Sequence, residues 1–521
     1  MTIDPNQNVN LQYLRSRLGR ICVAITGATP QEMLERAAEA VRENTFVEFR
    51  LDYLAKPLAA MPKLKDFLYL HREVTAIATC RRKATGGKFT GTIAAEMEIL
   101  SKAAAAGFHL VDVELQTAES LKPAQWKKLR GDGAAILISY HDFKTTKDLE
   151  SIYERIKPLN PDFIKIVSTA RKLADNVTMM RFLESKRDDG NVVGICMGDH
   201  GIISRVLGVR AGSRFTFAAA TVGEETAPGQ IAARTLIESY RIDQVDAGTR
   251  VYGVAGNPVR HSLSPIMMNT AFHRETVNAV FLALQTEKIA DLMVLIREIP
   301  VHGVSVTMPL KQEIMKHLDR TEPLSQKIGA CNTIVRSQDG KLIGYNTDVT
   351  GVVRPLEQRM DLRKAKILLL GAGGAARAAA FGLKQRGAEI FVLNRTPQTA
   401  QKLARDAEVK TIRRDQVAKT SFDVILNATS VGMLGNKQQT ILEEKELNAK
   451  LVFDMVYNPV ETPLLKMAKA KGAAVITGAE MFVQQAAEQF QLWTGKPAPR
   501  EDMWRVVTHV LRAQAELEKK D

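Results

Sequence analysis

The sequence predicts an α/β protein: an N-terminal (β/α)8 barrel followed by a unit of two subdomains, one of them a Rossmann domain. Three observations predict this. Eight short apolar segments alternate with helical patterns after residue 20, and a polar stretch near residue 245 interrupts the alternation. A strand, a glycine-rich turn and a helix then follow one another around Gly371. The 521 residues are enough for roughly three domains of about 150 residues each.

The eight apolar segments are Ile21–Thr26, Phe46–Asp52, Thr75–Arg81, Leu110–Leu115, Ala134–Asp142, Phe163–Thr169, Val192–Gly198 and Arg214–Ala219. Helical patterns lie between them, for example at Gln31–Glu43, Ile93–Ala106 and Leu149–Lys157. Strands that alternate with helices favour a parallel sheet, and eight repeats match the (β/α)8 barrel. An open, doubly wound sheet is the alternative that this pattern also allows.

Several of these strands carry polar residues where apolar ones are expected: Glu48, Arg50, Arg81, Asp112, Glu114, His141 and Lys165. In a barrel, chemistry takes place at the carboxyl ends of the strands. A salt bridge inside the barrel explains Glu48 or Asp112 alone equally well. Lys165 is different, because isoleucines flank it on both sides and its amine must be buried. Desolvation favours the neutral, nucleophilic amine, which suits a Schiff base with His141 as a general base.

Composition narrows the possible function. Lysine and arginine number 72 against 58 aspartates and glutamates, so the formal net charge is +14. A positive charge suits small anionic substrates, namely carboxylates and phosphates. Aromatic residues are only 6% of the chain, and no basic stripe is interleaved with them. Nucleic acid is therefore the weaker interpretation.

Cysteine usage and hydropathy indicate the compartment. Cys22, Cys80, Cys196 and Cys331 lie far apart without C-x-x-C spacing, so we expect no metal site and no disulfide framework. No apolar run approaches the ~18 residues that cross a membrane. Residues 1–20 are polar and lack the apolar segment of a secretory signal. We therefore expect a cytoplasmic protein that contacts no membrane, and the sequence indicates no oligomeric state.

The second half begins with a new apolar strand at Val251, after the linker-like segment "DQVDAGTR". The predicted division is a tail at 1–20, the barrel at 21–242, a linker at 243–250, a substrate-binding subdomain at 251–350 completed by helices at 478–515, and a Rossmann subdomain at 351–477.

The segment "KILLLGAGGAARAAAFGLKQRGAEIFVLNRT" predicts a dinucleotide site. Gly371 permits a tight turn, Gly373 lets the backbone approach a pyrophosphate, and Gly374 allows close packing where the helix starts, as do the small residues after it. The second strand ends in Asn394, Arg395 and Thr396 instead of an acidic residue. An arginine suits the 2′-phosphate of NADP, whereas a carboxylate would hold the ribose hydroxyl of NAD. The sequence therefore predicts NADP(H) as the cofactor.

Polar residues elsewhere in this half have two possible explanations. Ser264 could cap a helix that starts at Pro265, and Lys311 could be a solvated lysine on the first turn of a helix. Asn332, Asn346 and Asp348 follow short strands and could bind a polyol, or they could form Asx turns.

The first half resembles a known enzyme family. "EFRLD", "SYHDF", "FIKIV", "GIISRVLG" and "ETAPGQI" occur in this order between about Ile21 and Ile231, as in type I 3-dehydroquinate dehydratases. The resemblance implies that Lys165 forms a Schiff base with the substrate ketone, and that His141 removes the C2 proton and helps to expel water. It implies further substrate contacts from Glu48, Arg50, Arg81, Arg205, Thr226 and Gln230, with Arg205 holding the carboxylate.

The resemblance has three departures. Thr85 stands where the family usually has a glutamate, before the Gly-Gly pair, that is thought to orient the histidine. Ala24 replaces a common serine on the first strand, and Thr226 replaces a serine before "APGQ" while keeping a hydroxyl.

The second half resembles shikimate dehydrogenase over about Val251 to Leu511, through "HSLSP", "VTMPLK", "GACNT", "NTDVTG", "GAGGAAR", "NRT", "FDMVYNP" and "GAEMFVQQAAEQFQLWTG". The resemblance implies that Lys311 and Asp348 move a proton to and from the substrate oxygen. It implies shikimate contacts from Ser262, Ser264, Thr307, Asn332, Asp348, Tyr457 and Gln485. The implied cofactor residues are Gly371, Ala372, Gly373, Gly374, Ala375, Asn394, Arg395, Thr396, Thr429, Met455 and Gly478. Met268-Asn269 stands where the family usually has His-Asn.

Together the halves resemble the bifunctional dehydroquinate dehydratase–shikimate dehydrogenase family known best from plants. The resemblance implies two consecutive shikimate-pathway steps on small carboxylate substrates. Two alternatives remain at this point: the second half could prefer quinate and NAD, or the barrel could be a weak or scaffold module because of Thr85.

Overall fold

The computed structural model describes residues 11–131, 133–260, 262–433 and 440–517. The chain forms two compact units, and each is described by itself. One unit contains Met1–Thr249 together with Val294–Ile299, and the other contains Arg250–Met293 and Pro300–Asp521. No described helix is both long and apolar enough to cross a bilayer.

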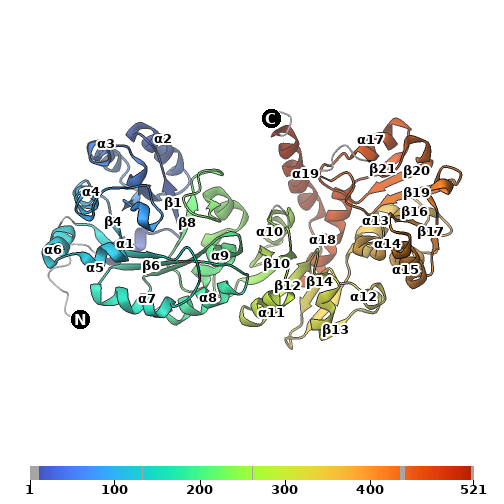
Figure 1. Cartoon of the computed structure of the whole chain (residues 1–521), viewed down its shortest axis with the longest axis horizontal. Helices are drawn as coiled ribbons and strands as arrows, with labels where there is room; N and C mark the ends of the chain where they lie inside the picture. The colour runs from blue at the N-terminus through green and yellow to red at the C-terminus, as the bar shows by residue number, and fades with distance from the viewer. Residues whose placement is uncertain (1–10, 132, 261, 434–439, 518–521) are drawn as a thin grey trace. The chain divides into compact units, whose positions relative to one another are not determined.

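The first unit, coloured blue to green in Figure 1, is built on one parallel sheet whose order is β7-β6-β5-β4-β3-β2-β1-β8-β9. The strands are β1 (Ile21–Ile25), β2 (Phe46–Arg50), β3 (Thr75–Thr79), β4 (Leu110–Glu114), β5 (Ala135–His141), β6 (Phe163–Thr169), β7 (Val192–Met197), β8 (Thr216–Ala219) and β9 (Ile231–Ala232). All eight predicted strands are present, and β1 pairs with both β2 and β8. The predicted (β/α)8 barrel is confirmed, and the open doubly wound alternative is not what the chain adopts.

One seam of the barrel has no strand ladder within the described residues, and it lies between β7 and β8. Single hydrogen bonds connect the two sides there. Arg214 N–H donates to the Val192 carbonyl over 2.8 Å, and Gly194 N–H donates to Ser213 Oγ over 3.2 Å. The sheet thus curls almost fully on itself, so the carboxyl ends of its strands surround one space.

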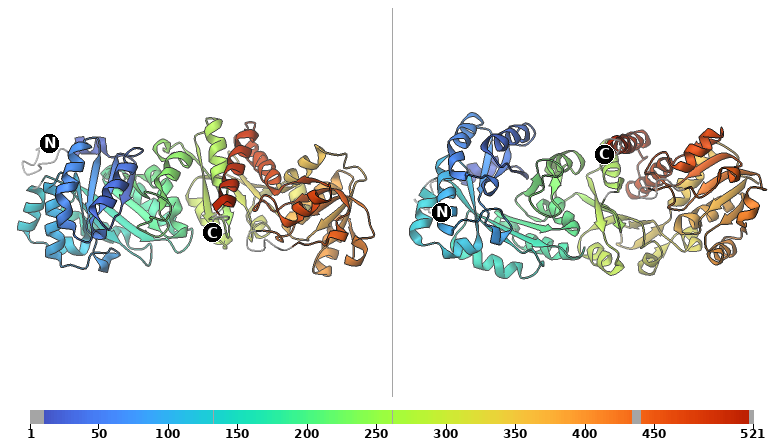
Figure 2. Two further views of the ribbon diagram at one scale, coloured as in Figure 1. Left: turned by 90° about the horizontal axis from the view of Figure 1, so that it is seen from above. Right: turned by 45° about the horizontal axis from the view of Figure 1, so that its top comes forward.

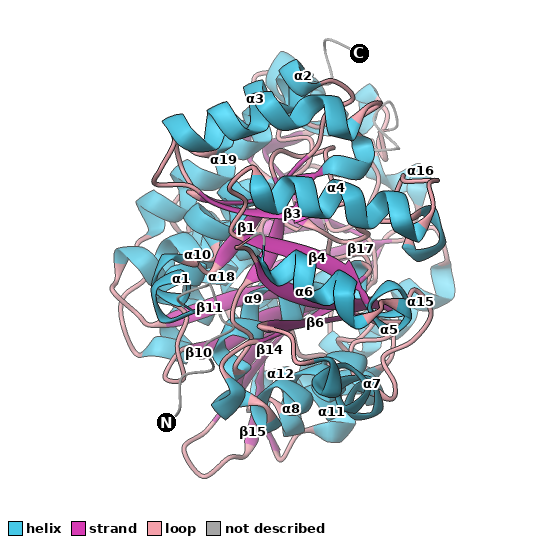
Figure 3. Ribbon diagram, turned by 90° about the vertical axis from the view of Figure 1, so that its left-hand side faces the viewer, coloured by secondary structure: helices cyan, strands magenta, loops and turns pink. Residues whose placement is uncertain are grey.

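Helices cover the outside of the barrel, as Figure 3 shows for α2, α3 and α4. They are α1 (Leu11–Arg17), α2 (Pro30–Ala40), α3 (Pro57–Leu70), α4 (Ile93–Ala105), α5 (Leu115–Ser120), α6 (Pro123–Gly131), α7 (Leu149–Ile156), α8 (Asp175–Ser185) and α9 (Ile202–Ala211). Helix α1 packs on the amino-terminal end of the barrel, where Leu14 is buried with Phe46, Phe163 and Phe215. It closes the end opposite to the polar residues.

The second unit begins with a mixed sheet of order β11-β10-β12-β14-β15-β13. Its strands are β10 (Arg250–Gly256), β11 (Ala279–Gln285), β12 (Val301–Val306), β13 (Arg320–Thr321), β14 (Thr333–Arg336) and β15 (Leu342–Tyr345). Its helices are α10 (Ser264–Arg274), α12 (Pro323–Ile328), α13 (Asp348–Glu357), α18 (Gly478–Thr494) and α19 (Arg500–Leu517), and α11 (Ile289–Glu298) belongs to it as far as Met293. Yellow-green α10 lies beside dark red α19, so the chain's last helices complete the part that its first strands begin (Figure 2).

Helix α10 differs slightly from its prediction. It begins at Ser264 itself, and Leu263 occupies the N-cap position without a side-chain hydrogen bond. Ser264 is therefore not the cap. The neighbouring Ser262 instead accepts the Ser264 N–H at 3.2 Å, so a serine hydroxyl just before the helix serves its first residue.

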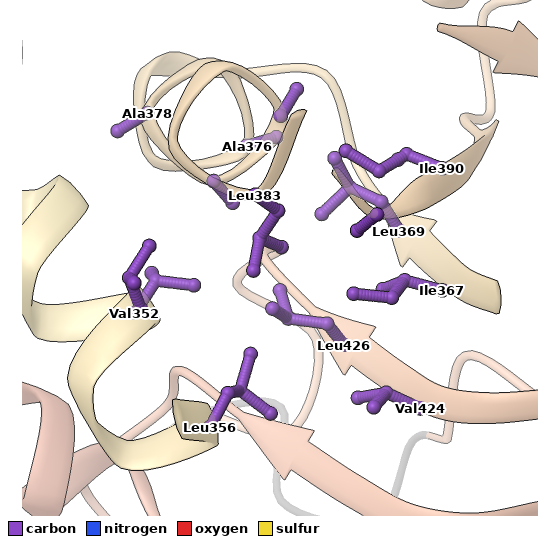
Figure 4. Packing of buried hydrophobic residues seen from close by; sticks show 14 of the residues in the cluster. Val352, Leu356, Ile367, Leu369, Ala376, Ala378, Leu383, Ile390, Val424 and Leu426 are labelled. Carbon is purple, nitrogen blue, oxygen red and sulfur yellow. The ribbon is translucent and has the colours of Figure 1, made fainter. Parts of the chain in front are cut away.

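The Rossmann part is a six-stranded parallel sheet of order β18-β17-β16-β19-β20-β21. Its elements are β16 (Lys366–Leu370), α14 (Gly374–Gln385), β17 (Glu389–Leu393), α15 (Pro397–Ala407), β18 (Lys410–Thr411), α16 (Arg414–Val417), β19 (Phe422–Asn427), β20 (Ala449–Asp454), α17 (Pro463–Ala470) and β21 (Ala474–Ile476). Figure 4 shows α13 and α14 directing aliphatic side chains, such as Val352 and Leu383, toward Leu369 and Leu426 of the sheet. The predicted strand–turn–helix–strand unit is confirmed.

Candidate active sites

A pocket opens at the carboxyl ends of the barrel strands and gathers the polar residues singled out in the sequence. Its lining contains every residue predicted for the dehydratase site: Glu48, Arg50, Arg81, His141, Lys165, Arg205, Thr226 and Gln230. Phe143, Phe217, Met197 and Ile195 supply apolar wall. Several strands and their connecting loops therefore contribute to one site, because the barrel brings their ends together.

Lys165 lies on β6 with its amine inside the barrel, and the residue is only 4% exposed. Its Nζ is 3.1 Å from Asp112 Oδ2 and 3.6 Å from Glu48 Oε1. It also sits 3.8 Å from the centroid of the Phe217 ring. Two carboxylates and an aromatic ring therefore surround this buried amine. The predicted burial of this amine is thus observed. The isoleucines on either side of Lys165 in the sequence did not indicate its charged partners.

Arg81 is the centre of a buried charge cluster beside Lys165. Its guanidinium contacts Asp112 at 2.9 Å and also donates to Glu114. Although burial opposes it, the charges of Lys165 and Arg81 hold the pKa of Asp112 well below its usual range. Asp112 therefore remains ionised, and it fixes the two cations relative to each other. A buried charge is tolerated here because it is paired on several sides.

His141, at the end of β5, is oriented by this cluster. Its Nδ1 lies 2.9 Å from Arg81 Nη1 and 3.1 Å from Glu114 Oε2. Burial and the Arg81 charge lower the pKa of His141, while Glu114 opposes the decrease. The pKa of Glu114 is itself lowered by His141 and Arg81 against the effect of its burial. An ionised carboxylate therefore faces one ring nitrogen of the histidine.

Arg205 is a buried cation without a carboxylate partner among the described residues. It is 2% exposed, and its guanidinium donates to the Pro228 carbonyl over 3.1 Å. Its Nε is buried and has no hydrogen-bond partner in the described part of the chain, and burial lowers its pKa to about 10. An unpaired buried guanidinium costs free energy unless an anion completes it. This is the most direct physical sign of an anionic ligand in the barrel pocket.

Three other predicted residues already have partners. Arg50 forms a two-pronged contact with Asp52, at 2.9 and 2.8 Å. Gln230 Oε1 accepts from the backbone and the hydroxyl of Thr226, at 2.7 and 3.1 Å. The loop that carries Thr226 and Gln230 thus holds its own shape at the pocket rim.

Thr85 directs its hydroxyl to its own loop. It ends a short turn, its hydroxyl donates to the Arg82 carbonyl over 3.2 Å, and it does not line the described pocket. The carboxylate beside His141 comes instead from Glu114, at the end of the neighbouring strand β4. Asp112 and Glu114 are polar residues on a predicted strand, and the sequence alone indicated no role for them. They are two residues apart on β4, so both side chains point to the same face of the strand. That spacing could have indicated that they act together.

In the second unit, Lys311 and Asp348 form a close pair. Lys311 Nζ is 2.5 Å from Asp348 Oδ2, and the Asp348 side chain is 8% exposed. Asn332 Nδ2 donates to the other carboxylate oxygen over 2.8 Å. Lys311 is therefore no freely solvated lysine, and Asn332 and Asp348 do not merely form local turns, since they bond to one another across 16 residues.

Of the remaining predicted shikimate residues, Ser262 and Ser264 follow β10, Thr307 follows β12, Tyr457 follows β20, and Gln485 lies on α18. Ser262 and Ser264 share a hydroxyl–hydroxyl contact of 3.1 Å. Thr307 follows β12 and donates its N–H to the Ala255 carbonyl of the adjacent β10 at 2.9 Å. Gln485 lies 3.4 Å from Asn332, and Tyr457 stacks on Phe482 at 4.9 Å between ring centroids. Asn346 Nδ2 donates to the Ala330 carbonyl over 2.9 Å.

A second pocket lies at the carboxyl edge of the Rossmann sheet. Gly371, Asn394, Arg395 and Thr429 line it, together with Gln401, Arg413 and Arg414. None of the described lining residues is acidic. Gly371 has φ +110°, a left-handed conformation that only glycine adopts readily. The tight turn predicted at this position is thus present.

The other predicted cofactor residues frame the same region. A Cβ on Gly373 would meet nothing within 4 Å, so open space lies over the turn, and α14 starts directly after it. A Cβ on Gly374 would lie 3.9 Å from Lys311 Cδ, so this helix start faces the Lys311–Asp348 pair. Met455 and Gly478 lie together, because a Cβ on Gly478 would be 2.6 Å from the Met455 carbonyl. A dinucleotide phosphate fits this region for three reasons. A helix starts there, open space lies over the turn, and the neighbouring pocket is rich in arginine.

Comparison with known protein families covers both units. A type I 3-dehydroquinase profile matches residues 21–247, and a shikimate dehydrogenase substrate binding domain matches 254–334. A shikimate/quinate 5-dehydrogenase profile matches 355–470, and a shikimate 5′-dehydrogenase C-terminal domain matches 478–508. The order of the matches follows the order of the structural units.

Individual relatives include both fused and single enzymes. The chloroplastic bifunctional 3-dehydroquinate dehydratase/shikimate dehydrogenase of Arabidopsis thaliana is 33% identical over 512 residues, which is 94% of this chain and 84% of that protein. An NADP(+) shikimate dehydrogenase from Maridesulfovibrio salexigens is 42% identical, covering 47% of this chain and 92% of its own. The solved shikimate 5-dehydrogenase of Thermus thermophilus with NADP(H) and shikimate is 35% identical, with a TM-score of 0.47, over 50% of this chain and 99% of its own. The chain therefore belongs to the family of bifunctional 3-dehydroquinate dehydratase/shikimate dehydrogenases.

Proposed function

We infer that the chain catalyses two consecutive shikimate-pathway steps: dehydration of 3-dehydroquinate to 3-dehydroshikimate, and reduction of that product to shikimate with NADPH. One observation carries this most directly. The barrel pocket holds a buried lysine, a histidine and an unpaired buried arginine together, and the second unit holds a lysine–aspartate pair beside a dinucleotide turn. The first set suits a keto acid that loses water, and the second suits a ketone that gains a hydride and a proton.

We propose that Lys165 is the nucleophile of the dehydration. Its neutral amine adds to the substrate ketone, and loss of water gives an imine. The protonated imine accepts electrons, so His141 can remove a proton from the adjacent carbon and form an enamine. The enamine then expels the hydroxyl, to which His141 returns a proton, and water is lost. Hydrolysis of the imine frees Lys165, so the net change is the removal of one water molecule.

Glu114 has a specific part in this proposal. His141 Nδ1 can accept from Arg81 or donate to Glu114, but it cannot do both at once. When Nδ1 donates to Glu114, Nε2 carries a lone pair and can act as a base. When Nδ1 accepts from Arg81, Nε2 carries the hydrogen and cannot. Glu114 is therefore the positioning residue that selects the basic tautomer. It takes the role of the family's usual glutamate, whose position Thr85 occupies in this chain.

We propose that Lys311 is the proton donor of the reduction. Bound NADPH supplies a hydride to the carbonyl carbon. Lys311 donates a proton to the oxygen as negative charge develops there, and Asp348 holds that amine in position. Asn332 fixes the second oxygen of Asp348 and so orients the pair. We assign Ser262, Ser264 and Thr307 to the substrate carboxylate, and Tyr457 and Gln485 to the rest of the ring. Cofactor roles are proposed for Ala372, Ala375 and Thr396, next to the glycine turn and Arg395.

A coupled assay tests the proposed function. Purified chain receives 3-dehydroquinate and NADPH, and the absorbance of the enone and of the nicotinamide is followed. Appearance of the enone with consumption of NADPH is expected. If only added 3-dehydroshikimate is reduced, the barrel does not contribute a dehydratase. If quinate with NAD is the preferred pair in the oxidative direction, the substrate and cofactor assignments are wrong.

The cellular compartment of the protein is a further proposal. All four cysteines are buried and free, which supports a reducing compartment such as the cytoplasm. The Arabidopsis relative is named as chloroplastic, and that name describes that protein. Fractionation of the native protein would identify the compartment.

A further inference from the structure

Three arginines line the pocket at the edge of the Rossmann sheet, and only one of them lies in the predicted cofactor motif. Arg395 follows β17, whereas Arg413 and Arg414 follow β18. Strand β18 pairs in parallel with β17, with Thr411 opposite Val392. Both strands end just after this pair, β17 at Leu393 and β18 at Thr411. The loops after the two strands therefore present their arginines at the same edge.

Arg414 is held in the pocket wall, because its guanidinium already has partners. It donates to the Ile441 carbonyl over 2.6 Å and to Glu446 over 2.5 Å. Glu446 is buried, so this pair is a fixed part of the pocket wall. Removing Arg414 would leave a buried carboxylate without its cation, which is a structural penalty unrelated to any ligand.

Arg413 differs from Arg414 in its partner and exposure. It pairs with Asp415 at 3.1 and 3.2 Å, and the two side chains are 76% and 63% exposed. An exposed pair of this kind contributes little to stability, because water and salt screen both charges. Arg413 can therefore exchange Asp415 for another anion at small cost. Arg395 has no carboxylate partner in the described part of the chain.

The charge of the ligand requires more than one cation. A phosphate monoester carries between one and a half and two negative charges, or roughly −2, near neutral pH. Arg395 alone can neutralise about half of that charge. We propose that Arg413 is a second ligand of the cofactor's 2′-phosphate and, with Arg395, determines the preference for NADPH over NADH. This inference rests on the proposed use of NADPH and extends it to a residue outside the glycine and Asn-Arg-Thr motifs.

Asp415 competes with the 2′-phosphate for the guanidinium of Arg413. In the free chain it accepts from Nε and Nη2 of that guanidinium, so the phosphate competes with it for Arg413. Replacing Asp415 by asparagine keeps the side chain's size and removes its charge. Arg413 is then free before the cofactor arrives, and the affinity for NADPH should rise while that for NADH does not.

Direct binding of NADPH and NADH to the full chain, followed by nicotinamide fluorescence, tests the proposal. For Arg413→Ala we expect the Kd of NADPH to rise about tenfold and the Kd of NADH to change less than twofold. Arg413→Lys should recover part of the loss, because it restores charge without the fork. Asp415→Asn should lower the Kd of NADPH about twofold to threefold. Arg395→Ala serves as the reference for loss of one phosphate ligand.

Arg363→Ala is the matched control. Arg363 also pairs with an aspartate two residues away, Asp361, and is also exposed, but it precedes β16 at the opposite edge of the sheet. It should leave both Kd values unchanged. Equal losses of NADPH and NADH in Arg413→Ala would place this residue against a part that both cofactors share and overturn the proposal. No loss at all would overturn it as well. A wild-type chain that binds NADPH and NADH equally would overturn the cofactor assignment itself, whatever the variants do.

Discussion

Glu114 Oε2 lies 3.1 Å from His141 Nδ1 inside the barrel, although the two residues are 27 positions apart in the chain. They lie on neighbouring strands, and the register pairs Glu114 with Ser139, two residues before His141. Side chains two residues apart on a strand share a face, so both Ser139 and His141 point toward the interior with Glu114. The barrel thus places a carboxylate beside the histidine, although a threonine, Thr85, stands at the position of the family's usual glutamate.

Glu114→Gln should slow dehydration by about 10- to 100-fold without preventing imine formation, since Lys165 and its carboxylates are unchanged. Removing the negative charge also lowers the pKa of His141 further, because Glu114 stabilises the imidazolium. The acid limb of the pH–rate profile should therefore move to lower pH while the plateau falls. Glu119→Gln, in an exposed pair with Arg155, is the control. An unshifted profile would assign Glu114 a purely structural role.

Lys165 should be the residue that forms the covalent intermediate. Borohydride added with 3-dehydroquinate should reduce the imine and add the mass of the bound substrate to the peptide carrying Lys165. Lys165→Met should abolish both the added mass and the dehydration, and Lys144→Met, on an exposed loop beyond β5, should change neither. Mass on any other lysine would contradict the assignment. Lys165→Met also leaves Asp112 with one cation fewer, so its folding should be checked by circular dichroism.

Lys311→Ala should abolish reduction of 3-dehydroshikimate and leave dehydration of 3-dehydroquinate intact. The substrate oxygen then lacks its proton donor after hydride transfer. The barrel pocket is unaffected, because Lys311 does not line it. Separate assays of the two reactions on the same sample measure this. Lys316→Ala, in the short helical turn that follows, is a suitable control for local disturbance. Loss of both activities would show that the two sites are not chemically independent.

Glu96 should make stability fall as the pH rises. It is 2% exposed, and burial raises its pKa from 4.5 to about 7, although Thr117 Oγ1 donates to it at 3.1 Å. Between these two pKa values the folded chain keeps the proton that the unfolded chain releases, so the free energy of unfolding decreases with pH across that window. Above about pH 7 this contribution levels off.

Glu96→Gln removes this titration and should therefore raise the melting temperature relative to wild type more at pH 8 than at pH 5. Glu98→Gln, two residues along the same helix and exposed, is the matched control and should show no such difference. Scanning calorimetry at the two pH values measures the effect. Equal shifts at both pH values would mean that Glu96 does not exchange its proton in this range.

Local patterns were sufficient to predict the elements that carry the site. The alternation of eight apolar segments with helical patterns predicted the barrel, because each strand is buried on both faces and each helix on one. The glycine turn at Gly371 and the strand on either side predicted the Rossmann unit, since few other sequences allow that backbone. The start of α10 was wrong by one residue, because helix ends depend on which neighbouring hydroxyl reaches the backbone.

By itself, the sequence determined which residues could react: a lysine between two isoleucines, a histidine on the preceding strand, and an arginine where a dinucleotide-binding strand ends. Only the tertiary structure decided which partners these residues have. Asp112 and Glu48 beside Lys165, Glu114 beside His141, and Arg413 beside the Arg395 loop all depend on the order and register of parallel strands. The physical reason is that local hydrophobic patterning specifies which segments form buried strands, whereas strand adjacency arises from packing between segments distant in the chain.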